Sequence, residues 1–341
     1  MFYTLDKYFE NLNPGHKKFE FRQGGRQDFF EWQKKARSKL RELLRLDNFP
    51  GFKIKAESGK FEDLGGFTRQ KLIVETEKDV FVPLYCLKPR GFSEKKKYPF
   101  AFALHGHIMG GKESPAGNRR LKNVNNAITC FNSNYGEVLA KKGFVVFAPD
   151  ARGFGERREK NWQKKFFRAS CTDLSNIAES LGLTLTGMFV IDLMRLLDFA
   201  FSLDYIDKNK VVCCGLSGGG LQSLYFSALD ERITKTVISG YYYGAYKSLI
   251  KQPACCCNYV PDLFLNFDMC DIGSLIAPRG LFIETGTEDA LNYDLDNALE
   301  QIEITKNNFD IAGAGNNFSN EVFEGGHKFS GKKSIEWLCW D

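Results

Sequence analysis

The sequence contains Gly215-Leu216-Ser217-Gly218-Gly219, and no other stretch says as much about the fold. An apolar run of strand character, residues 211–214, precedes it, and residues 220–226 have the pattern of a buried helix. A serine on such a sharp strand-to-helix turn points out of the sheet, and its neighbours must be glycine because the turn leaves no room for side chains. The pattern G-x-S-x-G alone occurs by chance, but the flanking strand and helix favour a functional serine over an incidental one.

The composition is that of an ordinary globular protein. Of the 341 residues, 43% are hydrophobic and 26% are charged, which allows one large domain or two small ones with a sizeable core. The formal net charge is only +5, and the basic run Lys95–Lys97 is more typical of a solvated loop than of a nucleic-acid surface. Residues 1–7 lack the order of a signal peptide, and no apolar run reaches membrane-spanning length. We therefore expect a cytoplasmic protein with neither nucleic acid nor membrane as a partner.

The ten cysteines do not have the spacing of a disulfide framework. Cys213 and Cys214 lie in the apolar strand before the serine, where a reduced cysteine behaves as a small hydrophobe. The run Cys255-Cys256-Cys257 has no C-x-x-C spacing, and neighbouring side chains are expected to diverge. We therefore expect reduced thiols and no metal site, with a metal at the triple cysteine as the less favoured alternative.

The first part of the chain differs from the rest. Residues 1–60 are predicted to form a helical extension that packs on a main unit, residues 61–341. Within the extension, residues 27–46 carry apolar side chains at roughly helical spacing. Two strand-like runs follow at 70–76 and 80–87, and the short charged link between them predicts an antiparallel hairpin.

From residue 98 onward, strands and helices alternate. The strand candidates are residues 100–104, 144–148, 211–214, 236–238, 281–284 and 321–323, and helical segments include 188–203 and 291–306. Several strands are apolar without alternation, as strands covered on both faces should be. The alternation predicts an α/β fold with a doubly wound, mostly parallel sheet. The polar stretch 152–186 has weaker periodicity and is expected to be an insertion over the site.

Chemically informative residues follow several of these strands, and the carboxyl ends of the strands in a parallel sheet are where sites form. Ser217 needs a base, and a histidine suits that task near neutral pH. His327, in a glycine-flanked loop after the last strand, is the predicted base, whereas His16 in the extension is interpreted as a surface residue. Asp289, after the penultimate strand, is predicted to orient His327. Glu288 is the alternative, because an error of one residue in the turn would exchange their roles.

Acyl transfer also needs backbone N–H groups that stabilise an oxyanion. The predicted donors are Gly218, at the helix N-terminus, and His107, in the loop after strand 100–104. His105 is expected to brace that loop by hydrogen bonding. Asp150 and Arg152 are expected to hold the neighbouring loop through a charge-assisted hydrogen bond, with catalytic roles for them less favoured.

With these residues in place, the chain from about Tyr98 to its C-terminus resembles the α/β-hydrolase superfamily. Within it, the chain is similar to the branch of dienelactone-hydrolase-like and acetyl-xylan-esterase-like proteins. The segments that carry the resemblance are 104–107, 150–156, 215–220, 258–261, 276–279 and 325–327. The order Ser217, Asp289, His327 is the order of α/β-hydrolases, and the long N-terminal extension is also in keeping with that branch.

The chain departs from this branch at three positions. Dienelactone hydrolases have a cysteine where this chain has Ser217. The carbohydrate acetyl esterases and cephalosporin deacetylases typically have glutamine after the serine and tyrosine in the oxyanion loop, where this chain has Gly218 and His107. The resemblance therefore implies hydrolysis of a carboxylic ester through an acyl-enzyme on Ser217, without a metal or organic cofactor. The substrate, a small-molecule or carbohydrate ester, stays open, as does a homo-oligomeric state.

Two other functions remain as alternatives. A peptidase of the prolyl-oligopeptidase type has the same residue order, but the roughly 97 residues before the first core strand cannot form the propeller that such enzymes carry. A non-catalytic binding protein would have no need of Ser217, Asp289 and His327 together. The aromatic run Tyr241-Tyr242-Tyr243 could line an acyl or aryl pocket, although aromatic residues more often belong to a core.

Overall fold

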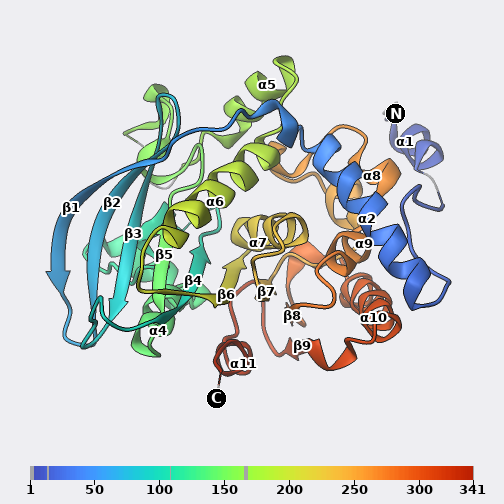
Figure 1. Cartoon of the computed structure of the whole chain (residues 1–341). Coiled ribbons are helices and arrows are strands. Elements are labelled where there is room, and N and C mark those ends of the chain that lie inside the picture. The colour runs from blue at the N-terminus through green and yellow to red at the C-terminus, as the bar shows by residue number, and fades with distance from the viewer. Residues whose placement is uncertain (1–3, 14, 108, 165–167, 341) are drawn as a thin grey trace.

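One nine-stranded sheet runs through the computed structural model, which describes residues 4–13, 15–107, 109–164 and 168–340 (Figure 1). The strand order is β1-β2-β3-β5-β4-β6-β7-β8-β9. Pairing is antiparallel from β1 to β5 and parallel from β5 to β9. The strands are β1 (Lys55–Asp63), β2 (Phe67–Glu77), β3 (Val80–Pro89), β4 (Tyr98–Leu104), β5 (Val145–Pro149), β6 (Ile206–Leu216), β7 (Lys235–Ser239), β8 (Gly280–Gly286) and β9 (Phe318–Phe323). The predicted doubly wound, mostly parallel sheet is confirmed.

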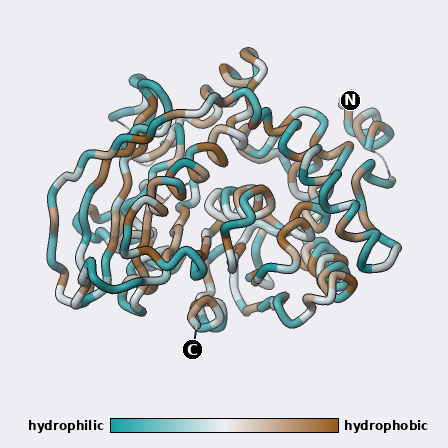
Figure 2. The backbone as a smooth tube through the Cα atoms, in the orientation of Figure 1, coloured by the Kyte–Doolittle hydropathy of each residue, from teal (hydrophilic) through white to brown (hydrophobic). Residues whose placement is uncertain are grey.

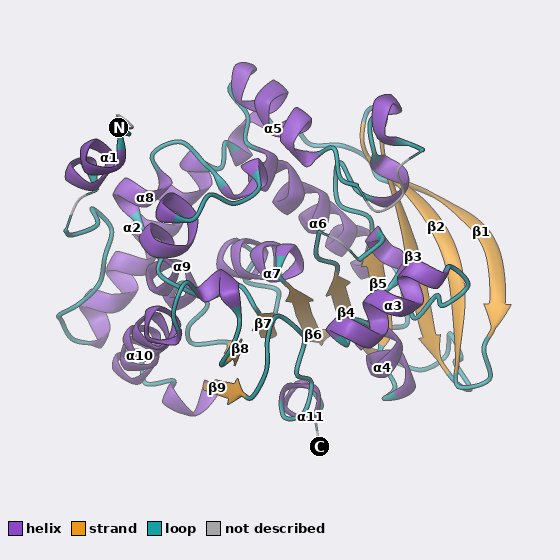
Figure 3. Cartoon of the chain, turned by 180° about the vertical axis from the view of Figure 1, so that it is seen from behind, coloured by secondary structure: helices purple, strands orange, loops and turns teal. Residues whose placement is uncertain are grey.

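Helices cover both faces of this sheet, as the views from the front and from behind show (Figures 1 and 3). The helices are α1 (Asp6–Leu12), α2 (Arg26–Leu43), α3 (Lys122–Phe131), α4 (Tyr135–Lys141), α5 (Cys171–Ser180), α6 (Leu185–Phe201), α7 (Gly218–Leu229), α8 (Leu263–Asn266), α9 (Met269–Ser274), α10 (Leu295–Ile311) and α11 (Ser334–Leu338). Along β4, Phe100 and Phe102 pack with side chains of α6 and α7, whereas Ala101 and Ala103 pack with those of α4 and α11. Both sets are fully buried, which explains why this strand lacks polar alternation.

The N-terminal helix α2 packs against α7, the helix that follows Ser217. Its apolar face buries Phe29, Ala36 and Leu40 completely. On the same face, Gln33 Nε2 donates to the carbonyl oxygen of Ala277 at 2.7 Å. The expected helix over residues 27–46 is therefore present, and its packing supports the backbone of the predicted site.

The antiparallel part of the sheet has one strand more than the predicted hairpin. β2 and β3 form that hairpin, and β1 pairs with the outer edge of β2. The β1 side chains are exposed almost throughout, so the strand has no buried face, and Figure 2 draws it largely in hydrophilic and neutral colours. A strand with no buried face lacks the alternation of apolar and polar residues by which a strand is predicted from sequence. The expected boundary at residue 60 falls inside this strand.

The segment 152–186 forms two short turns of helix, at Gly155–Arg157 and Lys160–Trp162, then α5 and the beginning of α6. Its residues 165–167 lie outside the described residues. Across the described part of the chain, no single helix is long and apolar enough to cross a membrane, and only the pair α5 and α6, bent by 100°, meets the length and composition required.

Candidate active site

Ser217 occupies a strained turn between β6 and α7. Its φ is 59° and its ψ is −119°, a conformation that side-chain-bearing residues rarely adopt. The turn is held because the Ser217 N–H donates to the carbonyl of Ser239 at 2.9 Å. A Cβ placed on Gly219 would lie 1.9 Å from the carbonyl oxygen of Leu104, and one on Gly215 would lie 2.4 Å from the Gly219 backbone. The glycines at both flanks are therefore a steric necessity.

His327 and Asp289 contact one another after two neighbouring parallel strands, β9 and β8. The distance from His327 Nδ1 to Asp289 Oδ2 is 2.8 Å. The other carboxylate oxygen of Asp289 accepts from the Leu291 N–H at 3.0 Å, and the side chain is almost fully buried. Since Nδ1 donates to the carboxylate, Nε2 of neutral His327 is free to accept a proton. The structure places Asp289 and not Glu288 against the imidazole.

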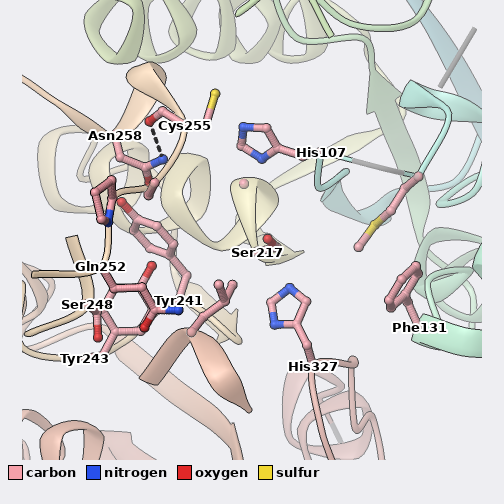
Figure 4. A pocket seen from close by; sticks show the side chains of 15 residues that line it. His107, Phe131, Ser217, Tyr241, Tyr243, Ser248, Gln252, Cys255, Asn258 and His327 are labelled. Atoms are coloured by element: carbon pink, nitrogen blue, oxygen red, sulfur yellow. Dashed lines mark hydrogen bonds between the residues drawn. The ribbon is translucent and has the colours of Figure 1, made fainter. Parts of the chain in front are cut away.

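Ser217 and His327 line one cavity of about 290 Å³ (Figure 4). In this view the serine hydroxyl lies between the imidazoles of His107 and His327. The described residues include no hydrogen bond from the Ser217 hydroxyl to His327, and such bonds are often long before substrate binds. Apolar side chains on the wall are Met109, Phe131 and Leu291, and polar ones are Ser248, Gln252 and Asn258.

The two predicted oxyanion donors, Gly218 and His107, line the same cavity as Ser217. Gly218 is the first residue of α7, where a backbone N–H has no partner within the helix. Neither its N–H nor that of His107 donates a hydrogen bond to another described residue. A Cβ on Gly218 would lie 2.8 Å from Nδ1 of His107. The two departures from the acetyl esterase pattern are thus coupled, because the His107 imidazole occupies the space that a side chain at position 218 would need.

His105 joins two loops behind the cavity. Its Nε2 accepts from the Ala151 N–H at 3.1 Å, so Nδ1 carries the proton and donates to the carbonyl of Gly106 at 2.9 Å. Burial lowers the pKa of His105, so it stays neutral at its buried position. It does not line the cavity of Ser217.

Asp150 and Arg152 each hold their loop through hydrogen bonds to other residues. Asp150 accepts from Nζ of Lys112 at 2.7 Å and from the N–H of Glu156 at 3.0 Å. Arg152 donates from Nε and Nη2 to the carboxylate of Asp192, at 2.8 Å each. Each residue makes a charge-assisted hydrogen bond, and among the described residues none joins Asp150 to Arg152. Lys112 and Asp192 lie 38 and 40 positions from these residues in sequence, where spacing gives no signal.

The cavity is covered by a segment that the sequence did not single out for this purpose. The described residues of 152–186 contribute nothing to its lining, whereas residues 248–258 contribute several side chains. Of the aromatic run, Tyr241 and Tyr243 line the cavity, and Tyr242 points away and hydrogen bonds Thr305. Two of the three tyrosines therefore line the cavity, as the sequence allowed.

Glu284, at the buried centre of β8, was also missed. Its carboxylate accepts from the N–H groups of Ser330 and Gly331, at 2.9 Å each, and from the hydroxyl of Ser334. Ser330 and Gly331 belong to the loop after His327, and Ser334 is the first residue of α11. A single acidic residue in an apolar strand could have indicated this role, because buried carboxylates need partners.

The cysteines also differ from expectation. The side chains of Cys255 and Cys257 converge with that of Cys171 and with His107, and their ligand atoms all lie within 4.8 Å of one another. Cys256, between them, is not part of this group. Cys255 precedes a single turn of 3-10 helix, Cys256–Asn258, and this turn brings the side chains of Cys255 and Cys257 to the same group. This is the set in the described structure that could hold a metal ion.

Comparison with known proteins agrees with the fold. The family model described as the Abhydrolase family matches residues 5–327. YtaP of Bacillus subtilis, a protein assigned as a hydrolase, is 26% identical over 242 residues, which are 70% of this chain and 75% of YtaP. A Bacteroides fragilis protein assigned as an acetyl xylan esterase superposes with a TM-score of 0.76 at 19% identity, covering 94% of this chain and 83% of the other. A glucuronoyl esterase from Solibacter usitatus gives 0.64 at 16% identity, with 90% and 91% covered. At these identities, the two structural matches establish a shared fold.

Proposed function

The chain belongs to the Abhydrolase family and has the α/β-hydrolase fold, and we propose that it is a serine esterase acting on a small carboxylic ester. One observation carries the proposal. Nδ1 of His327 is bonded to the buried Asp289, which leaves Nε2 free, and His327 lines the same cavity as the strained Ser217. This is the set that nucleophilic acyl transfer requires.

The proposed reaction begins when Ser217 Oγ attacks the acyl carbon and Nε2 of His327 takes the hydroxyl proton. Asp289 stabilises the imidazolium that forms. The developing oxyanion accepts hydrogen bonds from the N–H groups of Gly218 and His107. His327 then gives its proton to the departing alcohol oxygen. Water repeats the sequence on the acyl-enzyme, which releases the acid and restores Ser217.

The cavity favours a small substrate. Its volume of about 290 Å³ lies at the lower end of the range of ligand pockets, about 300–1,000 Å³. Met109, Phe131 and Leu291 suit a short acyl group, and Ser248, Gln252 and Asn258 can hydrogen bond a polar alcohol. The fold relatives named as acetyl xylan and glucuronoyl esterases act on carbohydrate esters by their names, which supports including acetylated sugars among the substrates.

The test is hydrolysis of p-nitrophenyl esters of increasing acyl length, followed by acetylated sugars. We expect the highest kcat/KM for short acyl groups, and loss of turnover in Ser217→Ala with unchanged thermal unfolding. A wild-type protein that hydrolyses aminoacyl amides but no esters would favour the peptidase. Thermal stabilisation by esters without turnover would favour a binding protein.

A further inference from the structure

Four side chains from three separate parts of the chain meet beside the cavity. His107 lies in the loop after β4, Cys171 is the first residue of α5, and Cys255 and Cys257 belong to the segment that covers the cavity. The Sγ atoms of Cys171 and Cys255 are 2.9 Å apart, and Nε2 of His107 is 3.1 Å from Sγ of Cys257. In Figure 4, the sulfur of Cys255 and the imidazole of His107 lie next to one another above Ser217.

We propose that these four side chains bind one zinc ion in a closed, tetrahedral Cys3His site. Three thiolates and one imidazole are a preferred ligand set of structural zinc. Zinc–sulfur bonds of about 2.3 Å and zinc–nitrogen bonds of about 2.0–2.1 Å place the ligand atoms of such a site about 3.6–3.8 Å apart. All four atoms already lie within 4.8 Å of one another. The closest pair, Cys171 and Cys255, separates by less than about 1 Å to reach this geometry.

The surroundings suit thiolates. Cys171 and Cys257 are buried, and Cys255 is half-buried. Cys171 stands at the N-terminus of a ten-residue helix, where the helix dipole favours negative charge. The Asn258 amide donates to Sγ of Cys257 at 3.8 Å and to the carbonyl of Cys255 at 2.8 Å.

The proposed ion has a structural role and does not touch the substrate. Four protein ligands leave no open position for a reacting group. Zinc binding replaces the three thiol protons, and it ties α5 and residues 255–257 to the loop that carries His107, one of the two proposed oxyanion donors. With Nε2 on the metal, neutral His107 carries its proton on Nδ1, the atom next to Gly218. The site is independent of the proposed esterase activity, since metal content is measured without a substrate.

The first experiment measures zinc by mass spectrometry in protein purified with a thiol reductant and without added metal. We expect about one zinc ion per chain in the wild type, and loss of zinc in Cys171→Ser and in Cys255→Ser. The matched control is Cys256→Ser, which alters the neighbouring thiol outside the cluster and should keep its zinc.

A second measurement remains valid if the ligand variants fold poorly. Wild-type protein, stripped by a chelator and refilled with cobalt(II), should show the intense visible absorption of tetrahedral thiolate-bound cobalt, and its reactive thiols should decrease by about three. A reduced wild type that neither contains nor takes up zinc or cobalt would overturn the proposal. So would a metal-free protein with a Cys171–Cys255 disulfide, or zinc content unchanged in the Cys171→Ser/Cys255→Ser double variant.

Discussion

Nδ1 of His327 donates a hydrogen bond of 2.8 Å to the buried carboxylate of Asp289, across the ends of the adjacent parallel strands β9 and β8. This contact sets the tautomer of the imidazole, and it stabilises positive charge when His327 takes a proton. Glu288, one residue earlier, makes no hydrogen bond or ion pair with His327 among the described residues. The conformation of the turn after β8 therefore determines that Asp289, and not Glu288, contacts His327.

Neutralising each of these two carboxylates in turn tests whether Asp289 or Glu288 orients His327. We expect Asp289→Asn to lower kcat by about 10³- to 10⁴-fold, because an amide favours the wrong tautomer of His327. Glu288→Gln, the matched control, should keep wild-type kcat. Ester hydrolysis under saturating substrate measures both. Equal losses in the two variants would contradict the assignment.

Glu284 is predicted to be a positioning residue for the loop that carries His327. Glu284→Gln replaces one acceptor oxygen by an amide NH2 group, a donor that would face other donors, so we expect a loss of unfolding free energy of about 1–3 kcal/mol. The displaced loop should lower kcat about tenfold or more with little change in KM. Glu324→Gln, on the exposed end of the same loop, is the control. A stability loss with unchanged kcat would limit Glu284 to a structural role.

The acid stability of the protein should depend on Asp192. Burial alone raises the pKa of this carboxyl, but Arg152 and Arg157 outweigh it and hold that pKa well below its ordinary value of 3.8. A depressed folded-state pKa adds stability above the ordinary value, and this contribution is lost as the pH falls below about 3.8. We expect Asp192→Asn to lose about 3–5 kcal/mol at neutral pH, because it leaves buried arginine charge unpaired.

Urea unfolding at several pH values measures this effect. The difference between wild type and Asp192→Asn should shrink as the pH falls below 3.8. The exposed ion pair of Asp198 with Arg232 provides the control, since Asp198→Asn should change stability by less than about 1 kcal/mol. If the loss of unfolding free energy in Asp192→Asn did not vary with pH, the electrostatic explanation would be refuted.

Two neighbouring tyrosines should respond to mutation in opposite ways. The hydroxyl of Tyr241 is buried without a hydrogen-bond partner among the described residues, whereas that of Tyr242 bonds Thr305. Removing an unpaired buried hydroxyl is neutral or stabilising, and removing a bonded one costs about 1 kcal/mol. Thermal unfolding should therefore show an equal or higher Tm for Tyr241→Phe and a lower Tm for Tyr242→Phe. The reverse order would mean that Tyr241 has a partner.

The sequence predicted those parts of the molecule that follow from local patterns. Ser217, Asp289 and His327 could be placed because each follows a predicted strand, and parallel strands bring their carboxyl ends to one edge of the sheet. β1 could not be predicted, since its side chains are exposed and carry no alternation. The partners of Asp150 and Arg152, and the meeting of Cys171 with Cys255, depend on tertiary packing across 38 to 84 positions.

The proposed nucleophile is tested most directly by covalent labelling. Wild-type protein is treated with a fluorophosphonate, digested, and mapped by mass spectrometry, with Ser248→Ala as a second cavity serine for comparison. We predict one label per chain on Ser217, retained in Ser248→Ala and absent from folded Ser217→Ala. A label on another residue, or a label that persists in Ser217→Ala, would contradict the account.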